Sequence, residues 1–363
     1  MDTDIDDIRD QKTFRDITFS NFKKTEVKRV LEQSIYDSKI EPACYWSAEL
    51  VCSGHYIDLW DICIGFYSKY IHIGNPKLVI YMDMRLKLFR SLLRNGYVGM
   101  ELRLRNHDQF RTLFCEMICI LCYSKRKHCF TEVKVKKDDF DLTQMTERFK
   151  APNVLFIDDV FLENDPKELF IALNEFAYNL TDDVRGNVSA CYWLEWILEF
   201  GHICKQKREK VVCERRIFAA VEPKYQMDII WLVWDIFLTE SNKRNSPFYR
   251  KIVECALNLF CFNYTQTCYK KRRSLVYFII ELFTEQVSFD EEIFKNKETI
   301  ASICKNVNKI YKQIKVNEVS PRTSYLYKNI KSDNLTKTME KLETLNNLGV
   351  DSVPRLKNDD DDV

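Results

Sequence analysis

The sequence feature that most constrains the fold is an internal duplication. The residues Cys44, Tyr45 and Trp46 are followed by Gly54-His55, and the pattern returns 147 residues later. Two further cysteines of the first copy recur 146 residues later, and a basic run follows the second of them in both copies. The members of the two patterns are Cys44, Tyr45, Trp46, Gly54, His55, Cys115 and Cys122 in the first copy, and Cys191, Tyr192, Trp193, Gly201, His202, Cys261 and Cys268 in the second. Because tryptophan and cysteine are rare residues, the shared spacing indicates two copies of one unit.

Each copy is predicted to be mainly helical. Only 8 glycines and 8 prolines are present, which argues against turn-rich sandwiches and barrels. We expect two tandem five-helix repeats, with Trp46 and Trp193 in the core, Gly54 and Gly201 ending helices, and His55 and His202 hydrogen-bonding nearby. Apolar residues recur at helical spacing over 25–36, 45–52, 57–70, 78–93 and 110–123, and again over 167–178, 192–204, 211–220, 225–238 and 248–262.

The segments outside the repeats differ in composition. Between the copies, Val133-Lys134-Val135 alternates and 153–157 is rich in β-prone residues, so a small β-hairpin is predicted there. After the second copy, 275–286 reads as an apolar helix packed across both copies, and 291–316 and 332–348 as more polar helices. The chain is thus divided into an acidic N-terminal segment (1–19), repeat 1 (20–128), a connector (129–160), repeat 2 (161–275), C-terminal helices (276–350) and an acidic tail (351–363).

Charge and cysteine content bear on location. Lys+Arg 55 against Asp+Glu 54 gives a net charge of +1, which is no global signature of a nucleic-acid binder. The first residues lack the basic and apolar regions of a signal peptide, and the apolar runs are too short to span a membrane. We therefore expect an intracellular protein that keeps its 14 cysteines as thiols.

Catalytic motifs are missing from the sequence. Neither the GxxxxGK[ST] loop nor GxGxxG occurs, and no acid/base pair or nucleophile elbow is recognisable. We expect a protein that is not an enzyme, uses no cofactor and takes no small-molecule substrate.

One group of cysteines invites a metal interpretation. Cys115, Cys119, Cys122, His128 and Cys129 offer zinc ligands within fifteen residues. Buried cysteines also act as small apolar residues, so a place in the core is the simpler interpretation. The sequence leaves both open.

Basic clusters are the strongest binding candidates. The first two follow equivalent helices of the two copies, so they could form paired patches for phosphates, with Tyr123 and Tyr269 beside them. The alternative is that basic residues simply favour helix C-termini and solvent. The clusters are Lys125, Arg126 and Lys127; Lys270, Lys271, Arg272 and Arg273; and Lys205, Lys207 and Arg208, continuing to Lys210, Arg215 and Arg216.

Two resemblances add to this picture. The stretch 44–50 with Gly54-His55, Trp60 and 73–78 resembles a family of proteins of nucleocytoplasmic large DNA viruses, of phycodnavirus and mimivirus type, with relatives of an iridovirus immediate-early protein. The family has no assigned chemistry, so it implies a virus-encoded protein connected with early gene expression and no site residues. Paired five-helix units are also similar in plan to the cyclin-like domains of general transcription factors, whose zinc ribbon is absent.

Together these observations favour a non-enzymatic viral helical adaptor. It would dock protein partners, and nucleic acid through the basic clusters, in viral transcription or replication. The expected location is the host cytoplasm, the viral factory or the nucleus, or the virion. The alternative is a structural or virion-associated protein that binds only proteins.

Overall fold

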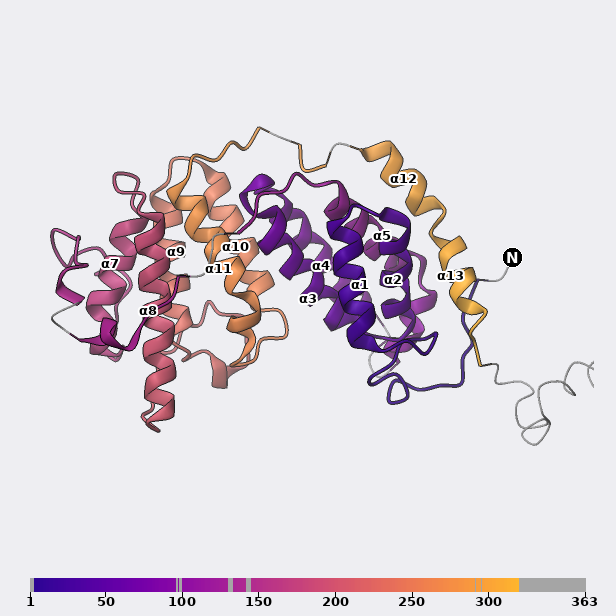
Figure 1. Ribbon diagram of the computed structural model, residues 1–363, viewed down its shortest axis with the longest axis horizontal. Helices are drawn as coiled ribbons and strands as arrows, with labels where there is room; N and C mark the ends of the chain where they lie inside the picture. The colour runs from indigo at the N-terminus through magenta and orange to yellow at the C-terminus, as the bar shows by residue number, and fades with distance from the viewer. Residues whose placement is uncertain are drawn as a thin grey trace, which may run out of the picture.

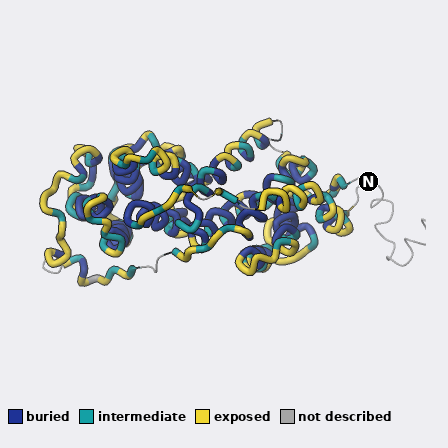
Figure 2. Tube along the Cα trace, turned by 90° about the horizontal axis from the view of Figure 1, so that it is seen from above, coloured by how far each residue is buried: buried dark blue, intermediate teal, exposed yellow. Residues whose placement is uncertain are grey.

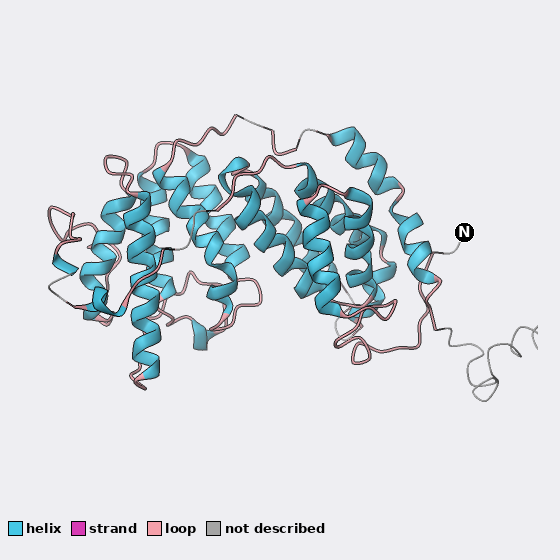
Figure 3. Cartoon of the chain, in the orientation of Figure 1, coloured by secondary structure: helices cyan, strands magenta, loops and turns pink. Residues whose placement is uncertain are grey.

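The protein is built from helices. The computed structural model describes residues 3–95, 97, 100–129, 133–141, 145–290, 292–294 and 296–319. Within these ranges no β-strand occurs (Figure 3), and the only β interaction is an isolated bridge between Ile17 and Lys23. The mainly α fold class is therefore confirmed. The helix expected over 332–348 and the acidic tail over 351–363 lie outside the described residues.

The helices form two lobes and a strap (Figure 1). The N-terminal lobe contains α1 (Lys24–Tyr36), α2 (Ile40–Cys52), α3 (Tyr56–Phe66), α4 (Leu78–Arg94) and α5 (Asp108–Tyr123). The C-terminal lobe contains α7 (Phe170–Leu180), α8 (Asn187–Gln206), α9 (Ile230–Lys243), α10 (Pro247–Phe260) and α11 (Cys268–Thr284). The C-terminal strap consists of α12 (Lys297–Lys305) and α13 (Val307–Lys315). Shorter turns are η1 (Tyr67–Ile71), η2 (His72–Gly74), η3 (Glu101–Asn106), η4 (Lys137–Phe140), η5 (Lys167–Leu169) and η6 (Pro223–Tyr225).

One hydrophobic core runs through both lobes. Trp60 of α3 lies 6.0 Å from the ring of Phe262, and Phe89 of α4 lies 6.3 Å from the same ring. Helix α10 packs directly on α4. Buried segments accordingly continue from one end of the molecule to the other (Figure 2). The lobes therefore share apolar surface that either one alone would leave in water.

Helix α11 joins the lobes, as expected of the apolar stretch after the second copy. It packs against α7 and α8 on one side and against α3 and η1 on the other. Ser68 and Ser274 share a buried hydrogen bond of 2.6 Å between their hydroxyls. His72 Nδ1 lies 3.0 Å from Glu281 Oε2, with both side chains buried. These polar contacts fix the register of α11 against the N-terminal lobe.

Two glycines expected to end helices behave differently. Gly54 follows α2 with φ +75°, in the left-handed region that favours glycine after a helix, so that prediction is confirmed. Gly201 lies inside α8, which continues to Gln206, so the prediction is wrong there. Its φ is not positive, and α8 continues through it to Gln206.

The helix predicted over 211–220 does not form. Its backbone instead bonds to the loop that follows: Cys213 N–H donates to Met227 O at 2.9 Å, and Arg216 N–H donates to Gln226 O at 3.0 Å. The buried Arg216 guanidinium pairs with Asp165 at 2.6 Å and Asp235 at 2.8 Å. These contacts satisfy polar groups of the segment 211–220 without a helix.

The β-hairpin predicted in the connector is also wrong for the described residues. No strand occurs over 133–141 or 145–160. Side chains of α7 take the place of a strand partner: Phe156 N–H donates to Asn174 Oδ1 at 3.1 Å, and Asn174 Nδ2 donates to Asn153 O at 2.8 Å. Glu175 accepts from the backbone N–H of Lys150 in the same way.

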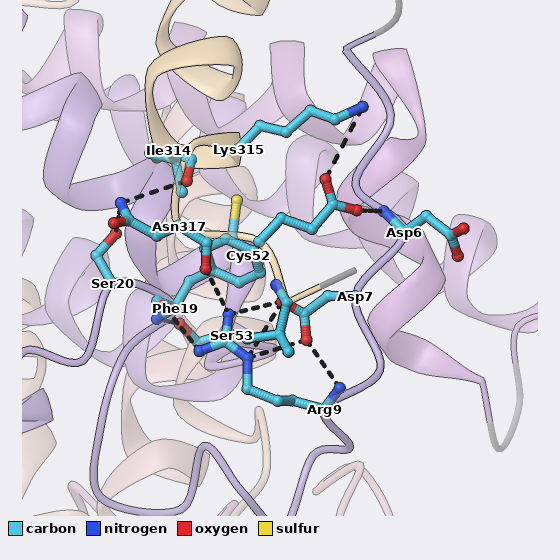
Figure 4. A network of polar contacts seen from close by, with 12 residues as sticks. Asp6, Asp7, Arg9, Phe19, Ser20, Cys52, Ser53, Ile314, Lys315 and Asn317 are labelled. Carbon is cyan, nitrogen blue, oxygen red and sulfur yellow. Dashed lines mark hydrogen bonds and ion pairs between the residues drawn. The ribbon is translucent and has the colours of Figure 1, made fainter. Parts of the chain in front are cut away.

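The C-terminal strap returns to the N-terminal lobe. Helix α12 packs on α5, and α13 packs on α2 and α5 (Figure 1). At its end, Val319 N–H donates to Asp7 Oδ2 at 2.9 Å, and Arg9 donates to Asn317 O at 3.1 Å and to Phe19 O at 3.0 Å (Figure 4). The first residues and the strap therefore hold each other against the lobe.

Candidate functional site

A basic pocket of about 540 Å³ lies in the C-terminal lobe. Its walls come from the C-terminal end of α8, the segment 208–230 and the turn between α10 and α11. Cationic side chains form much of its lining, namely Lys205, Arg208, Lys210, Lys224 and Lys270. The volume falls in the range that holds a small ligand or one unit of a polymer.

The end of α8 positions the first three cations. Arg208 N–H donates to Lys205 O at 3.1 Å, and Glu209 N–H donates to Cys204 O at 2.9 Å. This is the pattern of a helix that ends on a left-handed residue, here Arg208 with φ +63°. Glycine usually takes that place, because a side chain there is strained by about 1–2 kcal/mol. The residue in this strained position is an arginine that lines the pocket.

The pocket is electrostatically positive. Lys224 pairs with Glu222 at 2.6 Å, and Lys205 donates to Gln266 Oε1 at 3.3 Å. In the part of the chain that the structure describes, no carboxylate lies within ion-pair distance of Arg208, Lys210 or Lys270. The negative end of the α8 dipole favours cations at the end of that helix. It does not account for Lys224 and Lys270, because these come from other segments.

Two carboxylates, Glu209 and Asp228, also line the pocket. Asp228 Oδ2 accepts a hydrogen bond of 3.0 Å from the hydroxyl of Tyr264. Burial raises the pKa of Asp228 above its ordinary value, against the opposing effect of its hydrogen bonds and of Lys205.

Apolar side chains also line the pocket. Leu198, Met227, Ile229 and Ile230 line it together with the half-buried Tyr269. Gly201 lets the loop approach α8 closely, because a Cβ at that position would lie 2.5 Å from Ile229 Cδ1. Cationic and apolar side chains in one lining suit a ligand that carries both negative charge and a flat or apolar group.

The first predicted basic cluster is largely engaged in the fold. Arg126 donates to the carbonyls of Ile35 and Tyr36 and so caps α1. Lys127 pairs with Glu285, which follows α11. Lys125 is exposed but does not line the pocket.

The second predicted cluster is divided. Arg272 is buried, donates to Phe260 O at 2.7 Å and pairs with Asp61 of α3 at 2.7 Å. Arg273 pairs with Glu195 at 3.1 Å. Lys270 and Lys271 are exposed, and Lys270 reaches the pocket. Arg272 therefore serves the lobe interface, whereas Arg273 pairs within the C-terminal lobe.

The third cluster is the one that forms a site. Lys205 and Arg208 line the pocket with Lys210, whereas Lys207 is exposed on the same helix end and outside the lining. Sequence reasoning missed Lys224, whose only signal was its place after Pro223 at the start of η6. Tertiary packing alone brings Lys224 and Lys270 to this helix end.

The recurrent anchors have unequal surroundings. Trp193 is 1 % exposed and stacks on Phe149 at 6.0 Å, whereas Trp46 is half-buried and meets Phe22 edge-on at 5.4 Å. The prediction of a core position is thus confirmed for Trp193 and only partly for Trp46. Cys44, Cys191, Tyr45 and Tyr192 lie on the same helices as these tryptophans.

The two histidines of the duplicated pattern both make hydrogen bonds. His55 Nε2 donates to Ile17 O at 3.1 Å, and the His202 ring lies 2.9 Å from Gln206 Nε2. Their roles differ, since His55 precedes α3 and His202 lies within α8.

The cysteines weighed as zinc ligands in the sequence do not all meet in the structure. Cys115 and Cys119 approach Cys44 of α2, and Cys122 is buried further along α5. Cys129 donates its backbone N–H to Lys69 O, and the His128 ring lies against Tyr36 and Tyr70. No disulfide joins any two of the cysteines, all of which are described.

Comparisons with known proteins found no relative of this chain. No family model matches it, and neither a curated protein nor a solved structure does. Among the described helices, none has the length and apolar character needed to cross a membrane.

Proposed function

We propose that the protein is a non-enzymatic helical adaptor that binds single-stranded nucleic acid through the basic pocket. The observation that carries the proposal is the meeting of cations from three separate segments: Lys205 and Arg208 at the end of α8, Lys224 in η6 and Lys270 in α11. Because the strong negative charge of nucleic acid lies on its phosphates, such a group gives affinity without reading sequence.

A single strand fits the pocket better than a duplex. The bases of a single strand are unpaired, so they can turn away from one another and stack on aromatic or apolar protein surface. Here the half-buried Tyr269 ring and the side chains of Met227 and Ile229 offer that surface beside the cations. The absence of a global charge excess agrees with local binding of a few nucleotides rather than with wrapping of a long duplex.

The alternative remains an adaptor that binds proteins only. The engagement of Arg126, Arg272 and Arg273 within the fold favours it, since these are three of the seven residues in the two paired basic clusters. The resemblance of residues 44–78 to proteins of large DNA viruses supports a role in viral transcription or replication for either adaptor.

We also infer that the two lobes arose by duplication of one helical unit. Tyr45–Trp46 and Tyr192–Trp193 form edge-to-face pairs with the same centroid distance of 5.2 Å. In both lobes, an aromatic ring from the segment before the first helix packs on the tryptophan. The missing helix over 211–220 in the second lobe supports divergence after the duplication and limits the likeness to paired cyclin-like domains.

Fluorescence anisotropy with a labelled oligothymidine tests the binding proposal. Contact with about four phosphates predicts that log affinity falls with log salt at a slope of about −3. Reversing charge at Lys205, Arg208 and Lys270 should reduce the slope to about −1 and weaken binding at least about tenfold at 50 mM salt. Lys251→Glu, an exposed lysine of α10 outside the pocket, is the matched control and should leave binding unchanged.

A second pair of variants separates the charge of Arg208 from its backbone strain. Arg208→Gly should weaken oligonucleotide binding yet raise the free energy of unfolding by about 0.5–1 kcal/mol, because glycine relaxes the positive φ. Arg208→Ala should weaken binding without that gain. If the oligonucleotide does not bind at low salt, or binds the triple variant equally well, the protein-only adaptor is the correct function.

A further inference from the structure

Three thiols meet between α2 and α5, which pack side by side in the N-terminal lobe (Figure 1). Cys44 Sγ lies 3.9 Å from Cys115 Sγ and 3.8 Å from Cys119 Sγ. All three sulfur atoms lie within 4.8 Å of one another. Cys115 and Cys119 are four residues apart and therefore face the same side of α5. Two helices thus hold three sulfur atoms in one triangle.

The triangle is shielded from bulk water. Cys44 is 3 % exposed, Cys115 is 4 % exposed and Cys119 is 0 % exposed. In the part of the chain that the structure describes, no further cysteine, histidine or carboxylate ligand atom joins this group. A metal ion at this place would therefore be bound by sulfur alone.

We propose that Cys44, Cys115 and Cys119 bind one copper ion as Cu(I) in a trigonal site. Thiolates are soft ligands that select Cu(I) and zinc among the first-row metals. Such a metal bonds to thiolate sulfur at about 2.3 Å, so a flat triangle around it has sulfur–sulfur edges of about 4.0 Å. The measured separations of 3.8 and 3.9 Å lie close to that value, and the third edge is below 4.8 Å.

The number of ligands favours Cu(I) over zinc. Structural zinc sites use four protein ligands, and zinc sites with three protein ligands keep the fourth position for water or substrate. The burial of all three cysteines works against a bound water here. Cu(I) has a filled d shell and accepts three soft ligands without a fourth.

The group suits a metal better than a disulfide. A disulfide requires two sulfur atoms about 2.05 Å apart, and it would leave the third thiol unpaired. On metal binding, thiols release their protons to solvent and the sulfur atoms donate electron pairs, while copper enters and remains as Cu(I). Because burial penalises net charge, two thiolates and one retained thiol, with one net negative charge, are favoured over three thiolates with two.

Titration of the full chain with Cu(I) tests the proposal. Reduced, metal-free protein is titrated without oxygen, in competition with bathocuproine disulfonate, whose coloured Cu(I) complex reports the ion that the protein does not hold. We expect about one Cu(I) ion per chain to be retained. X-ray absorption at the copper edge should show three sulfur neighbours at about 2.3 Å.

Single-cysteine variants assign the ligands. Cys44→Ala and Cys119→Ala should each weaken Cu(I) binding by at least about 100-fold, the upper end of what loss of even an outer partner of a metal ligand costs. Cys122→Ala removes a thiol of α5 that is equally buried but outside the triangle, so it should bind Cu(I) as wild type does. Circular dichroism of the metal-free variants checks that each is folded.

Hydrogen exchange of the wild-type protein gives a readout that needs no variant. Cu(I) should slow exchange in α2 and α5 and leave α9 and α10 unchanged. The trigonal site would be overturned by oxygen or nitrogen neighbours of copper, by zinc that displaces Cu(I), or by folded Cys44→Ala and Cys119→Ala variants that bind as wild type does. The basic pocket lies in the other lobe, so oligonucleotide binding should be the same with and without Cu(I), and either proposal can fail alone.

Discussion

At the scale of single residues, burial decides how His55 responds to pH. Its side chain is 10 % exposed, and Nε2 donates to Ile17 O at 3.1 Å. Burial lowers the pKa of His55 below its ordinary value, with Lys24 acting in the same direction and the Ile17 and Asp58 contacts opposing it. The folded protein therefore holds this imidazole neutral more strongly than the unfolded chain does.

We predict acid destabilisation that depends on His55. Above about pH 7 the ring is neutral in both states and contributes no pH dependence. As pH falls through the unfolded pKa of 6.5, the unfolded chain takes up a proton more readily, so stability decreases. His55→Gln should flatten the free energy of unfolding between about pH 6.5 and 5.5, measured by urea titration. His202→Gln is the control; an equal slope in wild type and His55→Gln would contradict the prediction.

At the scale of elements, close backbone approach positions the chain after α5. Gly74 of η2 lies against residues 125–127, and a Cβ there would lie 2.8 Å from Lys125 O and 3.2 Å from Lys127 N. Lys127 N–H also donates to Ile71 O at 3.3 Å. The basic run is thus held against η2 by its backbone and has little freedom to reshape around a ligand.

A pair of glycine variants tests this packing. Gly74→Ala should lower the free energy of unfolding by about 1–3 kcal/mol, because the clash is with backbone that cannot swing aside. Gly65→Ala in α3 should raise it by up to about 1 kcal/mol, because no atom lies within 4 Å and alanine favours the helix. Chemical denaturation measures both changes. Equal effects of the two variants would show that the approach of 125–127 to η2 is not tight.

At the scale of the whole molecule, Arg272 ties the lobes together. Its buried guanidinium binds Asp61 of α3 and the carbonyls of Phe260 and Phe262 at the end of α10. Together with the continuous core, this contact predicts that the lobes unfold as one unit.

Removal of that guanidinium should weaken both lobes at once. Arg272→Ala should cost about 3–5 kcal/mol, because it leaves buried acceptors and Asp61 without their partner. Circular dichroism and tryptophan fluorescence should report the same single transition. Lys271→Ala, at the exposed neighbouring position, should change stability by less than about 0.5 kcal/mol. Two separate transitions in the Arg272 variant would contradict the single cooperative unit.

Predictions from local sequence patterns were correct where contacts between residues near in sequence determine the structure. The apolar periodicity of 78–93 and 110–123 matches α4 and α5 to within a residue or two, since a helix is specified by contacts three and four residues apart. The same reasoning failed over 211–220, where the buried Arg216 with Asp165 and Asp235 outweighs helix propensity. It failed at Gly201 as well, because a glycine ends a helix only when the chain beyond it turns away.

The sequence by itself determined that the protein is mainly helical. It also contains the recurrent Cys-Tyr-Trp pattern and the clusters of basic residues. Only the tertiary structure decided which charges face a common pocket: Lys224 and Lys270 join Arg208, while Arg272 turns inward. It likewise decided that Cys115 and Cys119, rather than Cys122, meet Cys44. Helices form from neighbours along the chain, whereas a site depends on side chains that long-range burial of apolar faces brings together.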